Sequence, residues 1–190
     1  MSMWELPTSL NVNGKEWTIR SDFRAVLDIL KYFSDKEYEL DEKWEICLEI
    51  LYEDYENMPN SDKEEAARKA VEFIDMGIGK KDSKRPSVMD WEKDATLIIP
   101  AVNEVLGKEI RLESYIHWWT FLSAYMQVGD GLFAQVVSIR SKMSKGKKLD
   151  DFEKEFLREN KDLIQLNKEK QTRSEEEKKA LDELFGVKGR

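Results

Sequence analysis

Residues 115–122 constrain the fold more than any other part of this sequence, because they contain four aromatic side chains and the only histidine of the chain. A helix that begins near Glu113 would carry apolar side chains on two faces, which places it at the centre of the fold or between two subunits. Aromatic side chains bury about 150–250 Å² each and stabilise cores and interfaces alike, so both places stay open. The two faces carry Tyr115, Trp118, Leu122 and Met126, with Ile116, Trp119, Phe121 and Tyr125 beside them.

The length and the charge of the chain limit the number of domains and the kinds of partner that can be expected. The 190 residues fit one principal domain, expected over residues 1–160, followed by a charged tether and a C-terminal helix over 161–190. Charged residues make up 37% of the chain and the net charge is -8, so nucleic acid is disfavoured as a partner. No apolar run approaches the roughly 18 residues of a membrane-spanning helix, and no secretory leader is evident. These features predict a protein of the cytoplasm without a membrane partner.

The N-terminal region predicts a short β-hairpin. Asn13-Gly14 lies between two short alternating segments, which is the signal of a type I′ turn. An isolated hairpin is only marginally stable, so its apolar side chains must pack on the chain's own helices or on a partner. These side chains are Leu10, Val12, Trp17 and Ile19.

Helical periodicity dominates the rest of the chain and predicts a mainly α fold, an irregular bundle of six to eight helices with the short N-terminal hairpin. The third helix is expected to start with a capping box between Ser61 and Glu64, and Pro100 to kink or break a largely buried helix. Residues 77–87 are basic and rich in helix breakers, which predicts a mobile loop. The expected helices begin near Phe23 (capped by Ser21 or Asp22), after Asp41, at Ser61, near Trp91, Glu113 and Gly131, at Asp150 and at Ser174.

The helix expected from Gly131 should bury Phe133, Val136 and Val137, with Met143 as a further candidate. Just beyond them, five positive charges fall within nine residues. They form either a solvated basic loop or a docking patch for an acidic partner or for the acidic surface of another copy, with binding that weakens as salt rises. These residues, called the basic cluster below, are Arg140, Lys142, Lys145, Lys147 and Lys148.

Catalytic and metal-binding patterns are not recognisable in the sequence. His117 has no second histidine as a co-ligand, and although Glu113 would share its helical face, metal sites need three or four converging ligands. We therefore expect His117 to be structural, with a pH-sensitive contact or a metal or catalytic role as alternatives. Cys47 lies in an amphipathic segment and is expected in the core. Gly79-Lys80 lacks the spacing of a phosphate loop. These features predict a protein that is not an enzyme and that uses no cofactor or metal.

Several segments, taken in order, carry a resemblance to a known family. They are Asp90-Trp91-Glu92-Lys93-Asp94-Ala95, Ile98-Ile99-Pro100-Ala101-Val102-Asn103, the aromatic run at 115–122, Ile139-Arg140-Ser141-Lys142 and Lys145-Gly146-Lys147-Lys148-Leu149. Their order and spacing resemble the bacteriophage "gene product fifteen" family of tailed phages and prophages of Gram-positive bacteria. The match is strongest over residues 91–160.

The resemblance implies a tail-assembly chaperone that acts in the cytoplasm of the host bacterium. Its expected partners are the tape-measure protein, the tail-tube protein and further copies of itself, and the alternative is a structural tail component retained in the virion. The C-terminal helix could dock on a partner, dock on the chain's own body, or fray. The candidate protein-binding residues are Trp118, Trp119, Phe121, Tyr125, Arg140, Lys142, Lys145, Lys147 and Lys148.

Overall fold

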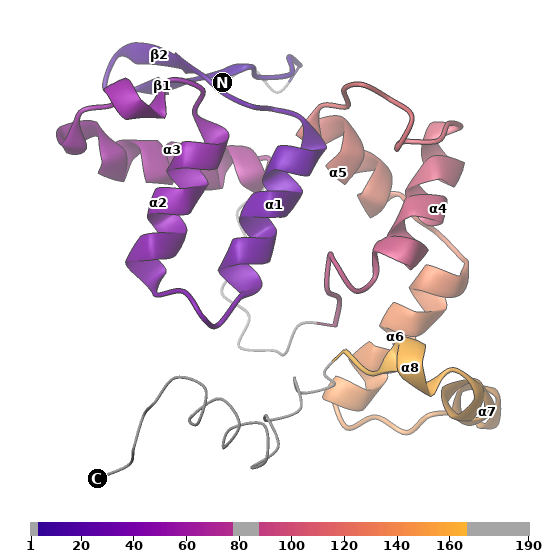
Figure 1. The fold of residues 1–190 in the computed structure, drawn as a ribbon. Coiled ribbons are helices and arrows are strands. Elements are labelled where there is room, and N and C mark those ends of the chain that lie inside the picture. Colours follow the sequence, from indigo (N-terminus) through magenta and orange to yellow (C-terminus); the bar gives the residue numbers. More distant parts are fainter. Residues whose placement is uncertain (1–3, 78–87, 167–190) are drawn as a thin grey trace, which may run out of the picture. The chain divides into compact units, whose positions relative to one another are not determined.

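A computed structural model of the protein describes residues 4–77 and 88–166 (Figure 1). The chain divides into two compact units, Met1–Gln135 and Val136–Arg190. The described residues contain eight α-helices and one two-stranded antiparallel sheet, which confirms the mainly α fold with an N-terminal hairpin. Most of the predicted loop at 77–87 and the predicted helix from Ser174 lie outside the described residues.

The hairpin joins β1 (Ser9–Val12) to β2 (Lys15–Thr18), with Leu10 opposite Trp17. Asn13 and Gly14 both have positive φ, 50° and 88°, as a two-residue type I′ turn requires. The predicted apolar side chains are all buried, and β1 packs against α3 (Lys63–Ile74). The hairpin is therefore supported by the chain's own helices.

Helices α1 (Phe23–Ser34) and α2 (Leu40–Leu51) lie side by side, with the hairpin at one end of the pair (Figure 1). Of the two caps proposed for α1, Asp22 is the one used, because its Oδ1 accepts a hydrogen bond from Arg24 N at 3.0 Å. Helix α2 begins at Leu40, before Asp41, where Glu39 and Glu42 form a reciprocal capping box. Cys47 on α2 is fully buried, and burial raises the pKa of its thiol to about 12.

Helix α3 starts two residues later than predicted, after the 3₁₀ turns Tyr55–Asn57 and Asn60–Asp62. The capping box predicted between Ser61 and Glu64 is wrong. Ser61 lies inside the second 3₁₀ turn, and Asp62 is the residue at the N-cap, without a side-chain cap bond. The apolar face of α3 places Ala66, Ala70 and Phe73 in the core, whereas Ile74 at the end of the helix is only half-buried.

Helix α4 (Ala95–Leu106) begins four residues after Trp91 and continues through Pro100, so the predicted break does not occur. The expectation that this helix is largely buried is also wrong. Only Ile98 and Val102 are buried, and Val105 is 37% exposed. Gly107 ends the helix in the left-handed conformation at φ 67°, which suits a residue without a side chain. One face of α4 therefore remains at the surface.

Helix α5 (Trp118–Met126) completes the first unit and packs against α1 and α4. Helix α6 (Leu132–Ser144) begins in the first unit and continues into the second, where α7 (Asp151–Glu159) and α8 (Lys161–Ile164) follow. In α6, Phe133, Val136 and Ile139 are buried, whereas Val137 is only half-buried, contrary to the prediction, and the candidate Met143 is exposed. Helix α7 begins directly after the predicted Asp150, which is its N-cap and whose side chain forms a capping box with Glu153.

Candidate protein-binding site

The helix that contains the second half of the aromatic run begins at Trp118, and not near Glu113 as predicted. Residues 116–118 pair with the chain that leads into α1: Phe23 N donates to Ile116 O at 2.9 Å, and Trp118 N donates to Ser21 O at 2.7 Å. Asp22 adds to this junction by accepting a hydrogen bond from Ile116 N. Glu113 therefore lies outside the helix. The prediction that it shares a helical face with His117 is wrong.

His117 is the N-cap of α5. Its Nδ1 accepts a hydrogen bond from Trp119 N at 3.0 Å, so the proton of the neutral ring is on Nε2, which donates to Pro7 O at 2.9 Å. The side chain is buried, and this burial lowers the pKa of His117 below its ordinary value of 6.5. The ring is thus held neutral, with both nitrogens occupied by structural hydrogen bonds.

Trp118 and Trp119 join α5 to the end of α3. The indole Nε1 of Trp118 donates to Ile74 O at 2.9 Å, and that of Trp119 donates to Phe73 O at 2.8 Å. These carbonyls lie in the last turn of α3, where helical partners run out. The two side chains are only 1% and 5% exposed. They therefore act as core side chains that also satisfy the end of a neighbouring helix.

Phe121 and Tyr125 continue the same cluster towards its edge. Phe121 is buried and stacks on Phe23, with ring centroids 4.6 Å apart. Tyr125 is half-buried and packs against Trp91, with centroids 4.9 Å apart. The structure thus places three of the four aromatic candidates in the interior of the first unit, where they present no surface to a partner.

The basic cluster divides into two groups, both within the second unit. Arg140 is buried, and its guanidinium donates to Ile164 O at 2.9 Å and also to Leu163 O. Lys142 forms an ion pair with Glu153 at 2.5 Å. These two cations hold α8 and the start of α7 against α6, so their role in the chain is structural.

Lys145, Lys147 and Lys148 form the second group, which we call the lysine loop. All three are exposed in the connection between α6 and α7, and their side chains make no ion pair or hydrogen bond with the described residues. The aromatic candidates belong to the first unit and the lysine loop to the second. Of the nine residues proposed from the sequence, these three are the ones presented most fully to solvent.

An apolar groove lies between α4 and the connection from α5 to α6, wholly within the first unit, with a volume of about 390 Å³. Sequence reasoning missed it, although Val128-Gly129-Asp130-Gly131-Leu132 places two apolar residues around a turn. Leu132 is 47% exposed and lines this groove together with residues of α4. The apolar residues of this α4 groove are Leu97, Pro100, Ala101, Val105, Val128, Leu132 and Phe133.

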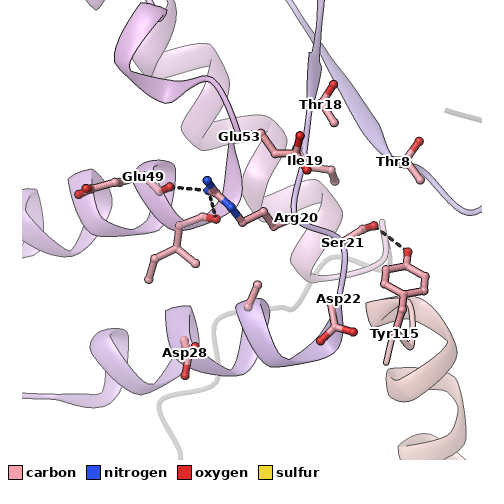
Figure 2. A pocket seen from close by; sticks show the side chains of 12 residues that line it. Thr8, Thr18, Ile19, Arg20, Ser21, Asp22, Asp28, Glu49, Glu53 and Tyr115 are labelled. Carbon is pink, nitrogen blue, oxygen red and sulfur yellow. Dashed lines mark hydrogen bonds between the residues drawn. The ribbon is translucent and has the colours of Figure 1, made fainter. Parts of the chain in front are cut away.

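A second depression opens where the hairpin, α1 and α2 meet, with a volume of about 1010 Å³ (Figure 2). Arg20 is the only lysine or arginine among the described residues that line it, and its guanidinium Nη1 donates to the carbonyl oxygens of Glu49, Ile50 and Tyr52 at the end of α2. We call this depression the acidic pocket, because four carboxylates line it. They are Asp22, Asp28, Glu49 and Glu53.

None of the helices in the described part of the chain combines the length and the apolar composition that a membrane-spanning helix requires. No group of three or more histidine, cysteine, aspartate or glutamate side chains in residues 4–77 and 88–166 is arranged to hold a metal ion.

Comparison with known proteins identifies the chain at the level of a family. No match was found among curated proteins or among solved structures. A family model described as Bacteriophage Gp15 protein matches residues 3–166, which span the hairpin, the aromatic run, the α4 groove and the lysine loop. Because this match covers most of the 190 residues, the chain belongs to the bacteriophage Gp15 protein family.

Proposed function

We propose that this phage protein is a tail-assembly chaperone that binds the tape-measure protein and keeps it soluble until the tail tube assembles. It acts by binding and not by chemistry, without a cofactor, in the cytoplasm of the infected bacterium. Support for a phage role comes from the family match. The observation that carries the binding role is the α4 groove, an apolar channel left open at the surface of the first unit.

The shape and chemistry of the α4 groove suit an amphipathic helix as its occupant. Helix-in-groove recognition uses apolar side chains spaced three or four residues apart that enter an apolar channel. Val105 and Leu132 offer exposed apolar area on its two sides, and Glu104 and Asp130 provide a polar rim. A long helical protein that must not aggregate before assembly presents such apolar stripes repeatedly, so several copies of this chain could cover one tape-measure protein.

The modest size of the groove also fits a temporary complex. A volume of about 390 Å³ accommodates only a few side chains. Affinity for each segment would then remain low enough for tail-tube subunits to displace the chaperone as they polymerise. Stable coverage would come from many such contacts along the partner.

Co-expression with the tape-measure protein encoded in the same phage tests this proposal. We expect the tape-measure protein to become soluble and to elute with several copies of this chain on size-exclusion chromatography. Val105→Asp should reduce co-purification at least about tenfold, because a carboxylate in an apolar groove costs more than about 1.4 kcal/mol.

Val71→Asp is the matched control, since Val71 is a similarly exposed valine on a helix, α3, and does not line the groove. Its co-purification should equal that of the unmodified chain. An insoluble tape-measure protein, together with this chain at constant copy number in purified virions by mass spectrometry, would overturn the proposal. That outcome would establish a structural tail component.

A further inference from the structure

The two units of the chain carry opposite net charge. Met1–Gln135 contains 16 lysines and arginines against 27 aspartates and glutamates, a net charge of -11. Val136–Arg190 contains 15 against 12, a net charge of +3. Because the two units have net charges of opposite sign, electrostatic attraction favours contacts between the first unit of one copy and the second unit of another.

The lysine loop is the most accessible positive feature of the second unit. Lys145, Lys147 and Lys148 are close together in sequence around Gly146, which turns the chain with φ 63°. Within the described residues, none of the three ammonium groups has an ion-pair partner, unlike Lys142, which is paired with Glu153. Phe152, four residues after Lys148, is 68% exposed and adds apolar area beside the charge.

The acidic pocket has the complementary composition. The carboxylate of Asp22 accepts hydrogen bonds from the backbone amides of Arg24 and Ile116. The other three carboxylates, those of Asp28, Glu49 and Glu53, make no ion pair or side-chain hydrogen bond with any described residue. Figure 2 shows Asp28, Glu49 and Glu53 among the residues that line the depression, and the guanidinium of Arg20 is directed to the end of α2. The half-buried residues Ala25 and Ile50 also line the pocket and add apolar side chains to it.

We propose that the lysine loop of one copy binds the acidic pocket of a second copy, so that the protein self-associates head to tail. Three ammonium groups meet three carboxylates, none of which has an ion-pair partner within the described residues of its own copy, and Phe152 supplies an apolar contact for Ala25 and Ile50. A head-to-tail contact uses two different surfaces, so it continues from copy to copy into a ring or a filament. Such contacts between copies would form without the tape-measure protein.

Sedimentation velocity of the full chain over a range of concentrations tests the proposal. We expect species larger than a monomer that increase with concentration and diminish between about 0.05 and 0.5 M salt, because charge–charge contacts are screened. The variant K147E/K148E should weaken association at least tenfold. The control K36E/K93E makes the same charge change at two exposed lysines outside the loop and should associate like the unmodified chain.

A charge-swap experiment identifies the receiving surface. The pocket variant E49K/E53K should also fail to associate by itself, because its pocket and its loop are then both basic. An equimolar mixture of E49K/E53K with K147E/K148E should associate again, since each acidic surface then has a basic partner.

A chain that remains monomeric at every concentration would overturn the proposal, as would a mixture that fails to recover association. Far-ultraviolet circular dichroism of each variant separates loss of association from loss of folding. Equal loss of association in K36E/K93E and K147E/K148E would also overturn it, because net charge and not the lysine loop would then control the contact.

Discussion

His117 accepts the backbone N–H of Trp119 through Nδ1 at 3.0 Å, and this hydrogen bond defines where α5 begins. The same ring donates from Nε2 to Pro7 O, so the start of α5 is tied to the chain just before β1. The only histidine of the protein therefore joins two segments that are 110 residues apart. Because both ring nitrogens of His117 make structural hydrogen bonds, substitutions of His117 should change the stability of the fold.

Replacing His117 by alanine should lower the free energy of unfolding by about 1–3 kcal/mol, because a buried helix cap and a buried carbonyl lose their partner. Urea denaturation followed by tryptophan fluorescence measures this change. His117→Asn is the comparison, since asparagine is a good N-cap but is too short to replace both contacts. An alanine variant as stable as the unmodified chain would contradict the capping role.

Stability should also depend on pH through His117. Its pKa is lowered by burial, so the unfolded chain binds a proton at higher pH than the folded chain does. The stabilisation is therefore fully present above pH 6.5, the ordinary value, and declines as the pH falls below it towards the folded pKa. Denaturation curves between about pH 7.5 and 5.5 should show this decline, and His117→Asn should lack it. Identical pH dependence in both proteins would exclude His117 as the source.

The indole of Trp119 should stabilise the fold through its hydrogen bond as well as through the space that the ring fills. Trp119→Phe removes the hydrogen bond to Phe73 O and leaves that end of α3 less satisfied, which should cost about 1–3 kcal/mol. Trp118→Ala also creates a cavity and should cost about 3–5 kcal/mol. Thermal unfolding followed by circular dichroism measures both. Trp4→Phe, at a 97% exposed position, should change the midpoint little. Native-like stability of Trp118→Ala would contradict its place in the core.

Arg140 and Lys147 should respond differently to the same substitution, although both belong to the basic cluster. Arg140→Met removes the donors to Ile164 O and Leu163 O, and should speed amide hydrogen exchange in α7 and α8. Lys147→Met removes an exposed charge, and should leave exchange in α7 and α8 unchanged and stability within about 0.5 kcal/mol. Similar exchange profiles in the two variants would contradict the structural role of Arg140.

Local signals predicted the hairpin and most helix positions because their causes lie within a few residues. Asn13-Gly14 supplies the two positive φ angles of the turn, and Asp150 with Glu153 supplies a reciprocal cap. The capping box predicted between Ser61 and Glu64 was wrong, although it is also a local signal. Ser61 belongs to a 3₁₀ turn that ends at Asp62, so Asp62 and not Ser61 is at the N-cap position of α3. Short capping motifs compete with neighbouring turns, and sequence patterns do not decide that competition.

The candidate binding residues were harder to predict, because exposure depends on partners distant in the sequence. Trp118 and Trp119 are buried since Phe73 and Ile74 provide carbonyls for their indoles. The α4 groove was missed because residues on α4 and residues near Leu132 come together only in the tertiary structure. Periodicity assigned α4 to the interior, but it does not show which side of a helix is covered.

The sequence by itself determined the mainly α class, the hairpin and the resemblance to a phage family, since each depends on local spacing or on the order of motifs. Tertiary structure alone decided which charges and which apolar side chains reach the surface. Arg140 and Lys147 look equivalent in the sequence, yet one has carbonyl partners 23 and 24 residues away and the other has none among the described residues. A charge or an aromatic ring is free to bind a partner only where the fold leaves its own contacts unsatisfied.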